Sequence, residues 1–198
     1  MKEPTCSRSS SKILTKKKLA VISGPSGAGK GTLVAEMLKR VPNILLSISA
    51  TTREPRSGEE DGVDYFFRSE KAFKEDILED RFLEWANIYG DFYGTPKGPI
   101  EKGLAENKLV ILEIDIQGAI QIQNNLGDNG VYIFIAPPSI NELRRRLVER
   151  KTETKESLET RLKIAEDELT KTEMYDYVII NDDLMTAANT LCEIVSEI

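Results

Sequence analysis

The chain has 198 residues, of which 40% are hydrophobic and 30% are charged. This length suits one α/β domain with small inserted lobes, and it suffices to bury a core. No apolar run approaches the roughly 20 residues of a membrane-spanning helix, and the N-terminal region lacks the apolar stretch of a secretory signal. The sequence contains no histidine. That excludes Ser-His-Asp chemistry, Cys-His chemistry and histidine-rich metal sites.

Charge is distributed unevenly along the chain. Residues 1–18 hold six basic residues and one acid, which gives +5; since the whole chain carries -6, the remainder carries -11. An acidic body argues against general nucleic-acid binding, which depends on neutralising phosphates. We expect residues 1–17 to form a basic, disordered tail, with a transit-like segment or an anion-binding arm as alternatives. Cys6 and Cys192 show neither metal nor disulfide spacing, which fits a reducing, cytoplasmic setting.

Strand and helix patterns alternate along the chain. Five short apolar runs are typical of buried parallel strands, and they cover residues 19–23, 44–48, 108–114, 131–136 and 177–180. Helical patterns cover residues 32–40 and 118–126, and a last one begins at about Leu184. Because helices separate the strands, the sequence predicts an α/β fold with a parallel core sheet and helices on both faces.

Two segments do not follow this alternation. Residues 49–98 are polar and aromatic, whereas residues 139–166 are highly charged with a helical period. We interpret both as lobes inserted into loops of the sheet. The core then comprises residues 18–48, 99–138 and 167–198.

The first strand leads into a glycine-rich loop. Its residues, Gly24-Pro25-Ser26-Gly27-Ala28-Gly29-Lys30, match the G-x-x-x-x-G-K pattern of a phosphate-binding loop. Glycines let successive N–H groups point at one anion, the following helix adds its positive end, and Lys30 adds a full charge. The alternative is an ordinary glycine-rich turn, which the flanking strand and helix patterns disfavour. The loop predicts an enzyme that moves a phosphoryl group out of a nucleoside triphosphate.

The loop departs from the usual pattern where a magnesium ligand is expected. Gly31 follows Lys30 in place of Ser or Thr, and Thr32 comes one position later. Either Thr32 substitutes, or the metal is held mainly through water and the nucleotide phosphates, as magnesium tolerates. Asp115 directly follows the 108–114 run and can orient magnesium waters or a ligand hydroxyl. The alternative is a helix cap.

The 49–98 segment carries a candidate anion site. Arg53 and Arg56 lie close together, and Tyr65 and Tyr93 are near them in sequence. Two guanidinium groups and two phenolic hydroxyls can together hold a phosphate dianion. The alternative is a pair of exposed arginines on a solvated surface.

A series of segments resembles the guanylate kinase family. In chain order they are GPSGAGKGT, SISATTREPRSGEEDGVDYFF, FLEWANIYGDFYGTP, LVILEIDIQGA, IFIAPPS, RRRLVERKTETKESLETRL and VIINDD, and they cover nearly everything after Lys18. The resemblance implies a core sheet with a GMP-binding lobe at 49–98 and a mobile lid at 139–166. It also implies transfer of the γ-phosphoryl group of ATP to GMP, and to dGMP, in purine nucleotide metabolism, with Mg2+ as cofactor.

The resemblance further implies a role for individual residues. The implied GMP-binding residues are Ser49, Arg53, Arg56, Tyr65, Glu84, Tyr93, Thr95 and Asp115. Within this set, Glu84 accepts from the N1–H and 2-amino groups of guanine, while the hydroxyls of Ser49 and Thr95 donate to O6 and N7. The family commonly has Ser where Thr95 stands, and the hydroxyl is retained. The implied ATP-binding residues are 24–32, Arg146, Arg150 and Asn181, and the implied catalytic residues are Lys30, Arg53, Arg146, Arg150 and Arg161.

Simpler interpretations stay open for several residues. The alternatives are a strand-edge acid for Glu84, a solvated helix face for residues 144–146, of which only one can point inward, and a helix cap for residues 181–183. For the whole chain, the alternatives are a scaffold module without catalysis, a kinase for another monophosphate and a GTP-hydrolysing switch. The retained Lys30 disfavours the scaffold, and the lack of an Asn-Lys-x-Asp motif disfavours the switch. We expect no nucleic-acid or membrane partner.

Overall fold

The computed structural model describes residues 18–88, 90–149 and 155–198. The expected tail at 1–17 and Arg150 therefore lie outside the described residues. The core is a five-stranded parallel sheet with the order β2-β7-β1-β8-β9. Its strands are β1 (Leu19–Ser23), β2 (Ile44–Leu46), β7 (Leu109–Glu113), β8 (Val131–Ala136) and β9 (Tyr177–Ile180). This confirms the predicted α/β fold with a parallel core sheet.

The central strands are apolar because both of their faces are covered. Every residue of β1 and β8 is buried. Side chains alternate between two hydrophobic clusters, so Ala20 and Ile22 face one layer and Leu19 and Val21 face the other. Such strands lack the apolar–polar alternation of a half-exposed sheet, which is why they appear in the sequence as continuous apolar runs.

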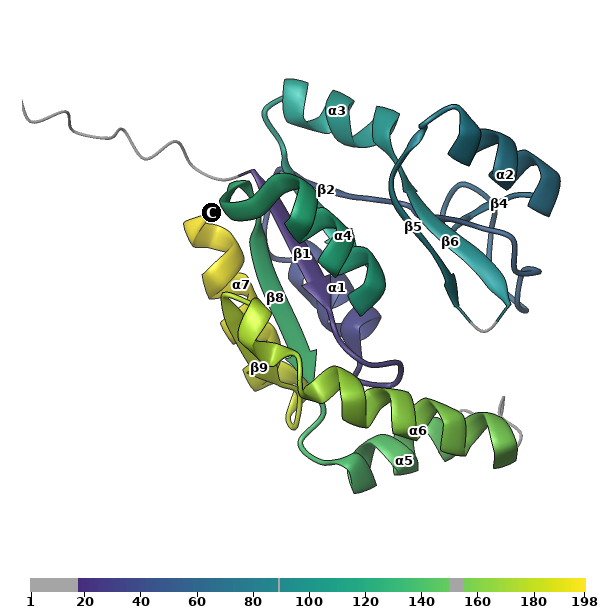
Figure 1. The fold of residues 1–198 in the computed structure, drawn as a ribbon. Helices are drawn as coiled ribbons and strands as arrows, with labels where there is room; N and C mark the ends of the chain where they lie inside the picture. Colours follow the sequence, from purple (N-terminus) through teal and green to yellow (C-terminus); the bar gives the residue numbers. More distant parts are fainter. Residues whose placement is uncertain (1–17, 89, 150–154) are drawn as a thin grey trace, which may run out of the picture.

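Helices cover the two faces in pairs (Figure 1). Helices α1 (Lys30–Leu38) and α7 (Leu184–Glu197) share one cluster, whereas α3 (Lys97–Ala105) and α4 (Ile116–Leu126) contribute to the other. Short 3-10 turns, η1 (Gly127–Asn129) and η2 (Thr172–Met174), lead into β8 and β9. Asp183 caps α7 by accepting the Thr186 N–H at 2.8 Å, so the capping role expected in 181–183 falls on this residue.

A second sheet lies beside the core (Figure 1). It has four strands in the order β4-β3-β6-β5, namely β3 (Ala50–Thr51), β4 (Phe66–Phe67), β5 (Phe82–Ile88) and β6 (Asp91–Pro96). Helix α2 (Glu70–Leu78) packs on it through Phe73, whose ring stacks on Phe82 at a centroid distance of 4.4 Å. The whole sheet falls within the 49–98 segment that interrupts the strand–helix alternation.

Two helices follow β8 at the carboxyl edge of the core sheet. They are α5 (Ile140–Glu149) and α6 (Lys155–Leu169), and Figure 1 shows them side by side below the ends of the core strands. Leu143, Leu147, Leu162 and Ala165 form a small cluster of their own between them. Helix α6 extends three residues beyond the predicted end of the inserted segment at 166. None of the described helices combines the length and apolar character needed to span a membrane.

Candidate active site

The phosphate loop joins the end of β1 to the start of α1. Gly24 and Gly29 have φ angles of 144° and 91°, which lie in the region that favours glycine. The Lys30 ammonium donates to the backbone oxygens of Gly24 at 2.6 Å and Pro25 at 3.2 Å, so it sits against the loop's own carbonyls. Because β1 and β7 are parallel neighbours, their ends place this loop beside Glu113 and Asp115.

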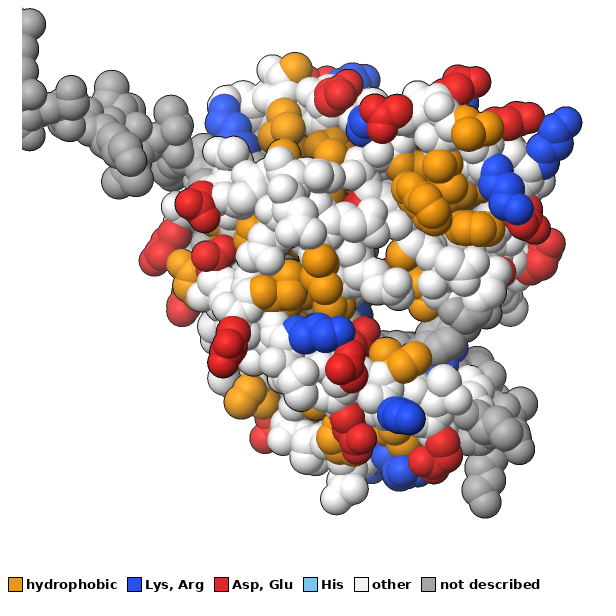
Figure 2. Space-filling model, viewed as in Figure 1, with side chains coloured by type: hydrophobic (Ala, Val, Ile, Leu, Met, Phe, Trp, Pro, Cys, Tyr) orange, Lys and Arg blue, Asp and Glu red, His pale blue; other side chains and the backbone are white. Residues whose placement is uncertain are grey.

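The loop opens into a cleft of about 420 Å³ between the second sheet and α6. Figure 2 shows a hollow between these two parts of the molecule. Ten of the predicted site residues line the cleft: Gly24, Ser26, Lys30, Ser49, Arg56, Tyr65, Glu84, Tyr93, Asp115 and Arg161. Residues as far apart in the sequence as Gly24 and Arg161 thus line the same cleft, which is large enough for a ligand.

Glu84 is a buried carboxylate in the wall of this cleft. It lies on β5, the edge strand, yet only 5% of it is exposed. The Thr95 hydroxyl on β6 donates to Glu84 Oε1 at 2.6 Å, across a cross-strand pair. Burial raises the pKa of Glu84 to about 7, against the lowering effect of the Thr95 hydrogen bond. Because this carboxylate is buried and lines the cleft, it is more than an acid on the edge of a strand.

The two arginines of the second lobe occupy different positions. Arg56 is exposed and lines the cleft. Arg53 is held behind the wall: its guanidinium makes two 2.9 Å hydrogen bonds to Glu59, and its Nε donates to the Tyr93 hydroxyl at 3.2 Å. Arg53 is not among the cleft-lining residues. It therefore orients Tyr93 while its Nη2 group is held by Glu59.

Acidic side chains gather at the end of β7. Asp115 lines the cleft and also accepts the Gly118 N–H at 3.0 Å, so the capping interpretation of Asp115 holds alongside the functional one. Burial raises the pKa of both Glu113 and Asp115, and the Lys30 charge partly offsets this in each case. A cation entering here would find carboxylates that are poorly solvated.

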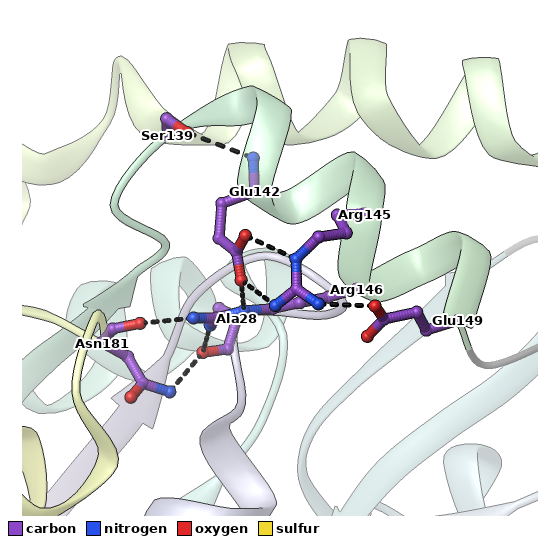
Figure 3. A network of polar contacts seen from close by, with 7 residues as sticks. All are labelled: Ala28, Ser139, Glu142, Arg145, Arg146, Glu149 and Asn181. Atoms are coloured by element: carbon purple, nitrogen blue, oxygen red, sulfur yellow. Dashed lines mark hydrogen bonds and ion pairs between the residues drawn. The ribbon is translucent and has the colours of Figure 1, made fainter.

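The arginines of α5 and α6 reach different faces of the phosphate loop. Arg161 donates to the Ser26 hydroxyl at 3.1 Å from the cleft side. Figure 3 shows Arg146 and Asn181 meeting at Ala28: Arg146 donates to the backbone carbonyl of Asn181 at 2.9 Å, and the side-chain Nδ2 of Asn181 donates to the backbone carbonyl of Ala28 at 2.7 Å. Arg146 and Asn181 are thus brought to the loop but do not line the cleft.

Only one arginine of the 144–146 run points inward. Arg144 pairs with Glu159, and Arg145 pairs with Glu142 and Glu149, all on the exposed surface. Arg146 is half-buried and also bonds Glu142 through its Nε at 2.8 Å. The run therefore combines the solvated face with one contact to the loop. Arg150 belongs to the residues that the structure does not describe.

The residues predicted to hold magnesium fit a water-mediated site. Thr32 is exposed and is not among the residues lining the cleft. Gly31 leaves the adjoining space to Glu113, whose Oε1 lies 3.5 Å from where a Cβ would stand. Within the described part of the chain, no three His, Cys, Asp or Glu side chains are grouped to bind a metal ion. A cation here would be bound chiefly by nucleotide phosphates and water, with Glu113 and Asp115 facing its hydration shell.

Several cleft residues were not identified from the sequence. They are Asn87, Ile88, Gly94, Glu113, Ile114, Gln117, Ile164 and Glu168. The two on α6 could have been predicted from the sequence. Ile164 and Glu168 lie three and seven residues after Arg161, so all three share one face of the helix. Burial raises the pKa of Glu168 to about 7, although the positive charge of Lys30 opposes the rise.

Comparison with known proteins follows this geometry. The family model described as guanylate kinase matches residues 16–198. The chain belongs to the guanylate kinase family. A guanylate kinase from Carboxydothermus hydrogenoformans is 52% identical over 173 residues, which cover 87% of this chain and 84% of that protein. The guanylate kinase of Caldanaerobacter subterraneus is 51% identical over 177 residues, covering 89% and 85% respectively.

A solved guanylate kinase shares the fold. The crystal structure of guanylate kinase from Anaplasma phagocytophilum aligns with a TM-score of 0.75 and 35% sequence identity, covering 90% of this chain and 84% of that one. The expected membership of the guanylate kinase family is thereby confirmed. The match spans the core sheet, the second sheet and the α5–α6 pair, so the cleft lies entirely within the region of likeness to guanylate kinases.

Proposed function

We propose that this chain transfers the γ-phosphoryl group of ATP to GMP, giving ADP and GDP, and that it also accepts dGMP. The observation that carries the proposal is the pairing of two unlike features in one cleft. One is the phosphate loop with Lys30, and the other is the buried Glu84 carboxylate held by Thr95. The first suits a triphosphate, and the second suits a purine with two adjacent N–H donors.

Glu84 supplies the base selectivity. Guanine presents its N1–H and 2-amino groups side by side, and one carboxylate accepts from both, whereas adenine offers an unprotonated N1 to the same oxygens. The Thr95 hydroxyl already donates its hydrogen to Glu84 Oε1, so its main role is to fix the carboxylate. Ser49 lines the cleft and supplies the hydroxyl that can donate to guanine O6 or N7.

Arg56, Tyr65 and Tyr93 hold the phosphate of GMP. All three line the cleft, and Arg53 supports them through the Tyr93 hydroxyl. Guanidinium and phenol groups donate to phosphate oxygens with charge assistance. The acceptor oxygen is already ionised at neutral pH, so no general base is required, in agreement with a chain without histidine.

The phosphate loop holds the donor. Lys30 and Arg161 face the cleft and stabilise the charge that spreads over the moving phosphoryl group, and Arg146 assists from the α5 side. Arg150 is assigned the same role by the resemblance to guanylate kinases. Asn181 lies at the loop and is assigned to the adenine of ATP. Magnesium, when bound, would neutralise charge on the ATP phosphates, with Glu113 and Asp115 facing its hydration shell. Thr32, the other predicted ligand, does not line the cleft. The substrates are soluble nucleotides, from which we infer a cytoplasmic setting.

A substrate panel tests the proposal. The purified chain is incubated with Mg-ATP and, in turn, with GMP, dGMP, AMP, UMP or TMP, and ADP formation is followed. We expect turnover with GMP and dGMP and very little with the other three. Lys30→Ala, purified identically, serves as the control against a contaminating kinase and is expected to be nearly inactive while folded. Turnover of AMP, UMP or TMP at the GMP rate would contradict the assignment, and no turnover at all would favour a scaffold module.

A further inference from the structure

The backbone conformation at position 118 does not require the glycine that is found there. It lies in the first turn of α4 with an ordinary helical φ, since it is absent from the positive-φ glycines. Alanine at such a position normally favours the helix over glycine. Its N–H caps the helix by donating to Asp115 Oδ1 at 3.0 Å, and any L-residue except proline retains that group. The reason for glycine here therefore lies in the surroundings.

The space beside Gly118 is filled by Glu84. A Cβ at position 118 would lie 2.5 Å from Glu84 Oε2 and 2.9 Å from its Cδ, well inside van der Waals contact. The Ile114 side chain would be 3.3 Å away. The carboxylate cannot turn aside freely, because its other oxygen accepts from Thr95 at 2.6 Å and only 5% of the residue is exposed. A side chain at 118 therefore requires either the carboxylate to move away from Thr95 or α4 to move away from β5.

We propose that Gly118 is a positioning residue for base selection: its missing side chain lets α4 close against β5 and fixes the plane of the Glu84 carboxylate toward the cleft. The inference rests on the proposed function of Glu84 and deepens it. Gly118 itself is not among the residues lining the cleft, so it acts through Glu84. The three atoms nearest the space that a Cβ would occupy belong to Glu84 and Ile114, and none belongs to the phosphate loop or Arg161. The effect of a substitution should therefore be confined to GMP.

Steady-state kinetics of Gly118→Ala tests this selectivity. We expect KM for GMP to rise about 10-fold or more, which corresponds to the loss of a charge-assisted hydrogen bond, while KM for ATP and kcat at saturating GMP change little. Gly98→Ala is the matched control, because Gly98 lies in the first turn of α3 and its Cβ would meet nothing within 4 Å. Gly118→Ala with an unchanged KM for GMP would overturn the proposal, as would an equal effect of Gly98→Ala.

A stability cycle keeps the test independent of catalysis. Thermal unfolding is compared for wild type, Gly118→Ala, Glu84→Ala and the double variant. In the wild-type background the new methyl group meets the carboxylate, so Tm should fall. In the Glu84→Ala background the carboxylate is gone, only Ile114 at 3.3 Å remains among the three nearest atoms, and alanine is the better helix former, so the same change should lower Tm less than it does in wild type. Equal shifts in the two backgrounds would mean that no such contact exists. Failure of the wild type to phosphorylate GMP would instead refute the proposed function, whatever the cycle shows.

Discussion

Glu84, the residue proposed to recognise guanine, also has a pKa close to neutral pH. Burial raises its pKa to about 7, so near neutral pH the ligand-free protein is a mixture of carboxylate and carboxylic acid. Only the carboxylate accepts from both guanine donors. KM for GMP should therefore rise as pH falls below 7, approaching tenfold per pH unit. The raised pKa affects the stability of the fold in the opposite direction, because the folded protein binds this proton more tightly than the unfolded chain does. The resulting stabilisation is present below the ordinary carboxyl pKa and is lost as pH rises through about 7.

Measuring KM for GMP from pH 8 to pH 6 tests this coupling. The phosphate of GMP also titrates near pH 6, but it does so equally for any variant. Glu84→Gln is isosteric and cannot ionise, so the ratio of its KM to that of wild type isolates the Glu84 carboxyl. We expect that ratio to be large at pH 8 and to shrink toward pH 6. A ratio independent of pH would show that Glu84 is ionised throughout the range.

Helix α6 places one partly buried acidic side chain, Glu168, in the wall of the cleft. Burial raises the pKa of Glu168 to about 7, and the nearest charges acting on it are Lys30, Asp115, Lys171 and Asp167, with Tyr175 packed close by. Because the folded state holds this proton more tightly than the unfolded chain does, the stability it gives is present below the ordinary carboxyl pKa and is lost as pH rises through about 7. Glu168→Gln should therefore have a higher Tm than wild type at pH 8, and the difference should be much smaller at pH 5.

Thermal unfolding at pH 5 and pH 8 distinguishes this from a general loss of negative charge. Glu166 lies on the same helix and is exposed, so Glu166→Gln removes the same charge without relieving burial. We expect its Tm difference from wild type to be small and independent of pH. Similar behaviour of the two variants would mean that α6 leaves Glu168 solvated.

Elements differ in how far the sequence foretells them. The core strands were predicted closely because strands covered on both faces are continuous apolar runs; β1, β8 and β9 have the predicted bounds. In the second sheet, β3 and β4 are two residues each, too short to show a period. The longer β5 alternates between buried and more exposed positions, a strand signal that was not used. The sequence also predicted the same phosphate-binding role for Arg53 and Arg56. In the structure Arg53 is bonded to Glu59 and only Arg56 lines the cleft, a difference that depends on the path of the loop between them. The Gly118–Glu84 contact joins α4 to β5, and no local pattern reports it.

At the scale of the whole molecule, the cleft draws its walls from three parts of the chain. The core sheet supplies Lys30 and Asp115, the second sheet supplies Glu84, and α6 supplies Arg161. A ligand that joins adenosine and guanosine through a chain of phosphates should contact all three at once. Each half then binds with the other already in place, so the linked ligand should bind far more tightly than ATP or GMP.

Ligand-dependent unfolding tests whether the three parts act as one site. At the same molar excess, the bisubstrate ligand should raise Tm more than ATP and GMP added together, because stabilisation grows with the logarithm of the ratio of ligand concentration to Kd and reaches about 2.7 kcal/mol at a 100-fold ratio.

Lys30→Ala should reduce the shift in Tm from ATP and leave that from GMP, whereas Glu84→Gln should do the reverse, and each variant should bind the bisubstrate ligand more weakly. If the bisubstrate shift did not exceed the larger single-ligand shift, the two nucleotides could not occupy the cleft together, and transfer between them would have no structural basis. The two variants guard against a trivial result, since a ligand that bound through its phosphates alone would respond to Lys30→Ala but not to Glu84→Gln.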